Sequence, residues 1–284
     1  GPGAGIGAAG YSGGGGGYGG AGGDGNGSLQ ATLLGGLGGG CYSYDQAGIT
    51  APTQLGSRGG NYWDNGVENL NTGGLGGGAI RLNVGGTLTV NGTISARGTS
   101  GTDNNNCCGA LDGGSGSGGS IYVTCGTLSG PGAIDASGGI AGTNYQWGGG
   151  GGGGRVSVVY GALGLTQPTL QAPGGNGNNR GGAGTIYTKL TSAPRGTITI
   201  DNGSTGGETT ELAGPLTWDA DVVIQNGGYL GPYHGQTNFD LTVTGNVTVA
   251  SNAGISANGR GRLDSNGPGA GIGAAGYSGG GGGY

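Results

Sequence analysis

Charged residues are scarce in this 284-residue chain. Lys and Arg together number nine, Asp and Glu fourteen, and the formal net charge is −5. Charged residues make up 8% of the chain, whereas an ordinary globular domain has about 25%. The basic residues are scattered along the sequence, so the basic stripe that nucleic-acid binding requires is missing. We therefore expect no nucleic-acid partner.

Large apolar side chains are also few. The chain has one Phe, one His and no Met, and hydrophobic residues make up 32% of it, where about 45–50% is usual. No apolar run approaches the roughly 20 residues that span a bilayer, and no signal-peptide pattern is present. These shortages argue against a conventional enzyme built around one large core and against a membrane-spanning segment.

Glycine is the most abundant residue, with 86 positions. Collagen is excluded because the chain has only nine prolines and no strict Gly-X-Y period. Disorder is the second alternative, since few side chains are available to offset the entropy lost on folding. The spacing of the glycines, described below, favours an ordered arrangement over disorder.

The two ends of the chain carry the same sequence. Residues 1–18, GPGAGIGAAGYSGGGGGY, recur without a mismatch as residues 267–284, so the chain is one full 266-residue repeat and the start of the next. This period indicates either a very long chain of near-identical tandem repeats or the unit of a periodic fibre. Both interpretations describe a polymer, whose partner is another copy of the same repeat.

Shorter repeats are nested inside the long one. GGAIRLNVGGTLTVNGTISARG (77–98) aligns with GGSIYVTCGTLSGPGAIDASGG (118–139) and with residues 153–175, and further copies begin at 184 and 241. Alternation places the apolar residues of each copy on one face of short strands. About three short strands per copy match one turn of a parallel β-helix. An antiparallel meander, the alternative, would alternate in the same way.

We therefore predict an all-β fold, a parallel β-helix (β-solenoid) with Gly-rich insertions packed as polyglycine II helices. Residues 1–25 favour polyglycine II because Gly, or once Ala4, stands at every third position, and this conformation has three residues per turn. Residues 148–154 form a second such segment, and flexible loops are the alternative for both. The predicted solenoid core is Ile80, Leu82, Val84, Leu88, Ile94, Ile121, Val123, Leu128, Ile134, Val156 and Val158.

Four segments follow from these patterns. They are residues 1–78 (Gly-rich polyglycine II and insertions), 79–200 (solenoid coils with Gly-rich insertions), 201–259 (a less Gly-rich β segment that continues the solenoid) and 260–284 (the start of the next repeat). Glycine is sparse in residues 201–250. We expect longer strands there, with the side chain of Trp218 inside.

The cysteines have no metal-binding pattern. Cys41, Cys107, Cys108 and Cys125 lack zinc spacing, and the only histidine, His234, is distant from them in sequence. An even number of cysteines in a Gly-rich repeat is typical of an extracellular disulfide set. The sequence leaves the pairing open, and buried free thiols are the alternative.

Few other residues point to chemistry. The sequons at Asn26, Asn91, Asn202 and Asn246 permit glycosylation, although this composition also produces sequons by chance. Asp219 and Asp221 are the only closely spaced acidic pair on an expected strand, and no basic or His partner lies near them in sequence. We therefore predict no catalytic residue, no metal ligand and no cofactor.

The unit GGSIYVTCGTLSGPGAIDASGG, followed by a Gly run and RVSVVY, resembles glycine-rich β-helical repeats of very large bacterial surface and secreted proteins. Turns of the LTVNGTISA type are similar to those of filamentous-haemagglutinin-like solenoids. In composition, the polyglycine segments are similar to Gly-rich antifreeze and mycobacterial surface proteins. The resemblance covers about residues 75–190 and 240–260. It implies an extracellular or cell-surface location and a structural or adhesive role.

These observations together predict a structural protein that is not an enzyme. Its role would be the repeat unit of an extracellular fibre or filament that assembles by end-to-end stacking of β-solenoids. The alternative is an adhesin stalk or a surface-binding module for glycans or ice within a giant repeat protein. In that case surface glycans would be additional partners.

Overall fold

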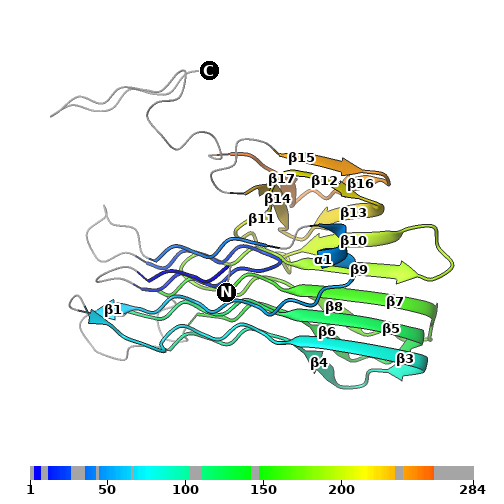
Figure 1. The fold of residues 1–284 in the computed structure, drawn as a ribbon, viewed down its shortest axis with the longest axis horizontal. Helices are drawn as coiled ribbons and strands as arrows, with labels where there is room; N and C mark the ends of the chain where they lie inside the picture. Colours follow the sequence, from blue (N-terminus) through cyan, green and yellow to red (C-terminus); the bar gives the residue numbers. More distant parts are fainter. Residues whose placement is uncertain are drawn as a thin grey trace, which may run out of the picture.

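The structure, a computed structural model, describes residues 3–7, 12–26, 36–42, 45–64, 67–102, 111–141, 147–233 and 239–258. Within these ranges the chain is β-rich, with mostly parallel sheets and one short helix, α1 (Gln46–Thr50) (Figure 1). No helix in the described ranges is long and apolar enough to cross a membrane. The strands are β1 (Trp63–Asp64), β2 (Val67–Glu68), β3 (Ala79–Thr89), β4 (Thr93–Ser95), β5 (Ser120–Ser129), β6 (Ala133–Asp135), β7 (Arg155–Leu163), β8 (Thr169–Gln171), β9 (Thr185–Leu190), β10 (Gly196–Asp201), β11 (Thr210–Leu212), β12 (Pro215–Trp218), β13 (Ala220–Gln225), β14 (Tyr229–Pro232), β15 (Asp240–Val243), β16 (Val247–Val249) and β17 (Gly254–Ile255).

Seven strands form the main sheet, in the order β16-β13-β10-β9-β7-β5-β3. The neighbours from β3 to β9 are parallel, and so are β10, β13 and β16. Strands β9 and β10 are antiparallel, so strand direction reverses at the connection formed by residues 191–195. Three further parallel groups are β4-β6-β8, β11-β14-β17 and β12-β15.

The nested sequence repeats become neighbouring strands. Ile80 pairs with Ile121, and Ile121 pairs with Val156. In the small sheet, Ile94 pairs in the same way with Ile134. Residues that align in the sequence are therefore register partners in the parallel sheets. Each strand adds an apolar, often β-branched side chain to a shared column, and this fixes the register because a slip by one residue would expose the column.

The columns form two apolar clusters. The first contains all the residues predicted for the core. Of these predicted core residues, the buried ones are Ile121, Val123, Leu128, Ile134, Val156 and Val158, and the partly exposed ones are Ile80, Leu82, Val84, Leu88 and Ile94. The second cluster surrounds Trp218 and includes Ile198, Val222, Ile224 and Leu230. The partly exposed residues belong to β3 and β4, which lie at the edges of their sheets.

The part of the chain after β10 extends the main sheet through β13 and β16. Trp218 is fully buried, as predicted. The expectation of longer strands is wrong, because β11 to β17 have two to six residues, whereas β3 has 11. Gly214, Asn226 and Gly227 adopt positive φ and turn the chain between the sheets, which keeps each strand short.

Helix α1 packs beside β7 and β9. The Asp45 carboxylate caps its first turn by accepting the N–H of Gly48 at 3.2 Å. Ile49 is buried in the second cluster, and Ser157 Oγ in β7 donates to the carbonyl of Thr50 at 2.5 Å. The helix thereby anchors residues 45–51, which lie between two Gly-rich segments, beside the main sheet.

Candidate functional site: the glycine layer and the open sheet edges

The Gly-rich segments leave the main sheet and run side by side away from it (Figure 1). We call this part the glycine layer. It contains residues 3–7, 12–26, 36–42, 54–60, 72–78, 96–102, 111–119, 136–141, 147–154 and 172–184. The segments are joined to one another by backbone N–H and C=O groups, and they therefore satisfy their main chain without forming a β-sheet.

Residues 147–154, the central segment, show how the layer is held together. Successive N–H groups donate in rotation to three neighbouring segments, so each neighbour is reached at every third residue. The bonds run from Gly149 to Gly13, Gly150 to Asn179, Gly151 to Gly139, Gly152 to Gly16, Gly153 to Gly182 and Gly154 to Ala136. The carbonyls of residues 147–152 accept in rotation from three other stretches of the chain, at residues 23–26, 115–118 and 175–178. The central segment therefore has six neighbouring stretches of chain, because residues 12–26 and residues 172–184 each pass it twice.

Glycine is required along the central segment because every side of it faces backbone. A Cβ on any residue from Gly149 to Gly154 would lie between 1.8 and 2.1 Å from a carbonyl oxygen of another segment. Segments at the edge of the layer have fewer neighbours and carry side chains that point outwards, such as Leu75 (61% exposed) and Ile140 (43% exposed). The glycine content of a segment therefore follows the number of its neighbours.

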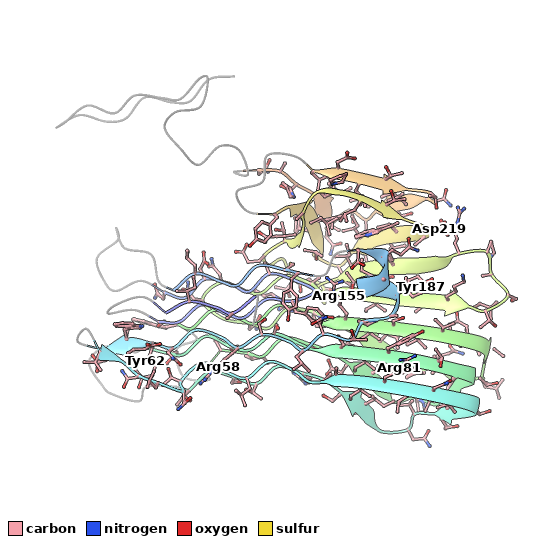
Figure 2. The ribbon with its side chains drawn as sticks, in the orientation of Figure 1. Arg58, Tyr62, Arg81, Arg155, Tyr187 and Asp219 are labelled. Carbon is pink, nitrogen blue, oxygen red and sulfur yellow. The ribbon has the colours of Figure 1, made fainter. Side chains whose placement is uncertain are left out.

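A buried polar cluster joins the glycine layer to the main sheet. Arg155 begins β7 directly after the central segment and is 1% exposed. Its Nη2 donates to the carbonyl of Tyr42 at 2.7 Å, and its guanidinium lies 5.0 Å from the ring centre of Tyr18 (Figure 2). The Ser120 hydroxyl donates to the carbonyl of Gln54 at 2.6 Å. The Tyr18 hydroxyl, 2.7 Å away, therefore donates to Ser120.

Burial raises the pKa of both tyrosines in this cluster. For Tyr18 and Tyr42 the main cause is loss of water around the phenolate, and the nearby Arg155 partly opposes the increase. The phenols are therefore neutral at physiological pH. The cluster acts as a structural joint, in which aromatic rings and backbone carbonyls surround a buried cation.

The described cysteines are both buried. Cys125 is a free thiol in β5, and burial raises its pKa, which makes it a poor nucleophile at neutral pH. The Sγ of Cys41 accepts the N–H of Glu211 at 3.2 Å. No disulfide joins two described residues. Cys107 and Cys108 lie outside the described residues, so a disulfide that involves them stays a prediction.

The four sequon residues differ in accessibility. Those at least partly exposed are Asn26, Asn91 and Asn246. Asn202 is fully buried, with Oδ1 accepting the N–H of Gly174 at 2.8 Å and Nδ2 donating to the carbonyl of Gly181 at 3.2 Å. Its amide links Gly174 and Gly181, which belong to two passes of segment 172–184, and the folded chain leaves no room for a glycan there.

Both carboxylates of the acidic pair make contacts with neighbouring residues. The Asp219 carboxylate accepts the Thr244 hydroxyl at 2.5 Å and lies 3.7 Å from Arg195 Nε (Figure 2). The Asp221 carboxylate accepts the backbone N–H of Asn246 at 2.7 Å. Both carboxylates therefore tie β12 and β13 to the following strands, and no described group of His, Cys, Asp and Glu side chains is arranged to hold a metal ion.

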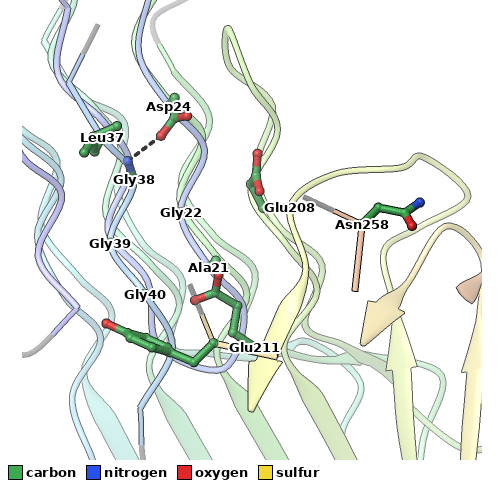
Figure 3. Close-up of a pocket in the computed structure, with 11 residues that line it drawn as sticks. Ala21, Gly22, Asp24, Leu37, Gly38, Gly39, Gly40, Glu208, Glu211 and Asn258 are labelled. Carbon is green, nitrogen blue, oxygen red and sulfur yellow. Dashed lines mark hydrogen bonds between the residues drawn. The ribbon is translucent and has the colours of Figure 1, made fainter. Parts of the chain in front are cut away.

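A groove of about 480 Å³ lies at the edge of the glycine layer (Figure 3). Its walls come from five parts of the chain and include three carboxylates. The lining residues are Ala21, Gly22, Asp24, Leu37, Gly38, Gly39, Gly40, Glu208, Glu211, Tyr233 and Asn258. Asp24 Oδ1 accepts the N–H of Gly38 at 2.8 Å, so part of this wall is bonded through a side chain instead of a neighbouring backbone.

The main sheet ends in the strands β3 and β16, and both ends of the apolar clusters are uncovered. In β16, Val247 is 48% exposed, although its register partner Val222 is 1% exposed. In β17, Ile255 is 48% exposed and its partner Leu230 is 1% exposed. At the other end the partly exposed residues are Ile80, Leu82, Val84, Leu88 and Ile94. Each end therefore presents an apolar surface beside a strand edge.

Comparison with known proteins gives no match among family models, curated proteins or solved structures. The functional interpretation therefore depends on the glycine layer, the groove and the open edges.

Proposed function

We propose that the chain is the structural repeat unit of an extracellular fibre, in which a β-solenoid carries a polyglycine II layer and repeats stack end to end. One observation carries the proposal: the apolar clusters continue to both ends of the main sheet and are uncovered there. A protein that acted alone would cover these strand edges or make them polar. A partner with the complementary end is a second copy of the same repeat.

The strand order supports the solenoid. Strands β12, β13 and β14 are followed in the chain by β15, β16 and β17, and each pairs in parallel register with its equivalent. Three short strands that return to the same three sheets make one turn of a parallel β-helix. Strands β5 and β6, followed by β7 and β8, repeat in the same way with Gly-rich segments between them.

The hydrogen bonds of the central segment support polyglycine II. This conformation has three residues per turn and no internal hydrogen bonds, so its N–H groups point in three directions and reach a given neighbour at every third residue. The donors from Gly149 to Gly154 follow this rotation through two complete turns. Flexible loops, the alternative interpretation, would not bond in a fixed rotation.

Stacking is geometrically simple because the chain already contains the required type of contact. A following repeat in the same orientation would place its β3 against β16, in antiparallel direction, as β9 and β10 pair within one repeat. Covering the exposed half of Val247, Val249 and Ile255 contributes roughly 1 kcal/mol for each side chain. Backbone hydrogen bonds along β3 would add to this.

Electron microscopy of a protein with several covalent repeats tests the proposal. The main sheet has seven strands per repeat, and strands lie about 4.8 Å apart. We therefore expect an unbranched filament with an axial repeat of roughly 34 Å. Val247→Lys together with Val249→Lys should prevent stacking, while Thr248→Lys, with its side chain on the other face of β16, should not. Particles that look like separate beads, or filaments unchanged by the double substitution, would refute end-to-end stacking.

A second candidate function is adhesion, and the end of the glycine layer far from the main sheet favours it (Figures 1 and 2). The β1–β2 hairpin there lies beside Tyr62, and Val67 and Leu70 are 65% and 72% exposed. Exposed apolar residues beside a partly exposed tyrosine and carboxylates suit surface glycans as ligands. Binding to immobilised glycans that is lost on Val67→Ser with Leu70→Ser would support this function, and equal binding by the variant would contradict it.

A further inference from the structure

Two of the described basic side chains, Arg81 in β3 and Lys189 in β9, form neither a hydrogen bond nor an ion pair with another described residue. The chain has few basic residues, and the other described ones all have polar partners. These are Arg58, Arg97, Arg155, Arg180 and Arg195. The two remaining cations are therefore available to an anionic ligand.

Arg81 and Lys189 lie on the same face of the main sheet. Arg81 pairs in register with Tyr122, and Tyr122 pairs with Ser157. Ser157 pairs in turn with Tyr187. Lys189 follows Tyr187 by two residues, so its side chain points to the same face. This face is opposite the first apolar cluster and carries helix α1 over part of β7 and β9 (Figure 2).

A second row of residues crosses the same four strands beside the first. Asn83 pairs with Thr124, and the register continues through Val159 to Lys189. Val159 packs against the second apolar cluster. We call the accessible part of the two rows the basic strip. Its members, all exposed or half-buried, are Arg81, Asn83, Tyr122, Thr124 and Lys189.

The Arg81 end of the basic strip is arranged to bind a carboxylate. Arg81 Cζ lies 5.5 Å from the ring centre of Tyr122, a cation–π contact that holds the guanidinium over the ring. Because the guanidinium is already held in place, less side-chain entropy is lost when it binds a ligand. Its fork of N–H donors matches the two oxygens of a carboxylate.

The middle of the basic strip carries neutral hydrogen-bonding groups. Thr124 Oγ1 donates to Asn83 Oδ1 at 2.8 Å, which leaves the amide donors of Asn83 for a ligand. Strands β3 and β9 are separated by three strand spacings, so Arg81 and Lys189 lie roughly 14 Å apart across the sheet. A small anion reaches only one of these charges. A polymer with several carboxylates and intervening hydroxyl groups reaches both.

We propose that the basic strip binds an acidic polysaccharide. Its carboxylates pair with Arg81 and Lys189, and its hydroxyl groups bond to Asn83 and Thr124 between them. No member of the strip is a large exposed apolar side chain, which a membrane or a protein interface would require. The net charge of −5 does not prevent binding, because exposed charges are screened beyond about 8 Å at physiological salt.

The basic strip belongs to a single repeat and is separate from the β1–β2 hairpin of the adhesion candidate. Binding by one chain therefore does not depend on filament assembly. In a stacked fibre the two rows would run along the stacking direction, because they cross the strands. One polysaccharide can then contact the strips of successive repeats, and its total affinity increases with the number of repeats.

Surface plasmon resonance with immobilised polygalacturonate and the monomeric 284-residue chain tests this binding at about 0.15 M NaCl. Arg81→Gln with Lys189→Gln should lower the affinity at least about tenfold. The matched control, Arg58→Gln with Arg97→Gln, removes the same charge from other parts of the chain and should change the affinity less than about twofold. Circular dichroism checks that each variant is folded.

Competition experiments give a second measurement on the wild type alone. Free galacturonic acid should compete only at a uronate concentration at least about 100-fold above that of the polymer, since a monomer contacts one end of the strip. Competition by the monomer at the same uronate concentration would contradict a polymeric ligand.

Three other results would overturn the assignment of the basic strip. They are unchanged affinity of the Arg81 and Lys189 double variant, equal binding to the neutral polysaccharide dextran, and stronger binding to phosphatidylserine vesicles than to polygalacturonate. Val67→Ser with Leu70→Ser should bind polygalacturonate as the wild type does, and loss of binding would place the site at the hairpin instead. Filament assembly is scored separately by electron microscopy, so its failure leaves the result for the monomeric chain unaffected.

Discussion

Replacing Gly151 by alanine would place a methyl carbon 1.9 Å from the carbonyl oxygen of Gly116. A normal contact between these atoms is about 3.5 Å, so the central segment and segment 111–119 must separate by roughly 1.5 Å. Two hydrogen bonds that join them, from Ser115 to Gly149 and from Gly118 to Gly152, are 2.9 Å long and would be lost. Leaving these buried groups unpaired costs about 1–3 kcal/mol for each bond.

The expected destabilisation by Gly151→Ala is therefore roughly 2–6 kcal/mol. For a chain of this size, each kcal/mol lowers the unfolding temperature by about 2–4 °C. Thermal unfolding followed by circular dichroism should show a decrease of roughly 5–20 °C. Gly92→Ala is the matched control, because a Cβ there has no atom within 4 Å. Equal unfolding temperatures for the two variants would refute the close-packed glycine layer.

Three further predictions concern single buried groups. Tyr18→Phe should cost about 1 kcal/mol through loss of its hydrogen bond. Burial raises the pKa of Tyr18 in the folded chain. The stability that the neutral phenol contributes is therefore complete below about pH 10 and is lost as the pH rises through the higher folded pKa. The urea midpoint of the Tyr18→Phe variant should decrease less steeply above about pH 10 than that of the wild type, and identical pH profiles would contradict the burial of the Tyr18 phenol. Cys125 should react with thiol reagents only after unfolding, and mass spectrometry that finds rapid labelling of the native chain would disprove its burial. Asn202→Ala should lower the free energy of unfolding, measured by urea denaturation, by roughly 2–4 kcal/mol, since two buried backbone groups lose their partners. The control Asn91→Ala replaces an exposed residue and should lower it little. Similar losses for both variants would show that the Asn202 hydrogen bonds do not stabilise the fold.

The register of the parallel strands could be predicted from the sequence because apolar residues recur in order. Ile80, Ile121 and Val156 occupy equivalent places in three nested copies and become direct neighbours in the main sheet. Packing in columns imposes the same spacing on each copy, so aligning the copies is equivalent to stacking them. Within the described residues 12–26, the period of three likewise matches the backbone bonds, which return to the same neighbour at every third residue.

Other features left no readable signal in the sequence. The reversal between β9 and β10 was not predicted because residues in parallel and antiparallel strands alternate in the same way. Helix α1 is too short to show a helical period. The burial of Arg155 was not predicted, because the basic residues were considered only for a nucleic-acid-binding stripe. Its position directly after a run of seven glycines, at the start of a strand, is the available clue that it lies at a junction.

The rotation of hydrogen bonds in the glycine layer also has a consequence for how such a chain can change during evolution. Inserting one residue into an edge segment rotates everything after it by a third of a turn, which would point a side chain such as Leu75 into its neighbours. Edge segments should therefore change length in steps of three residues. The central segment has glycine at every position from 148 to 154, so none of its faces carries a side chain. The length of this segment can therefore change by a single residue. Variation in length among repeats should follow this difference.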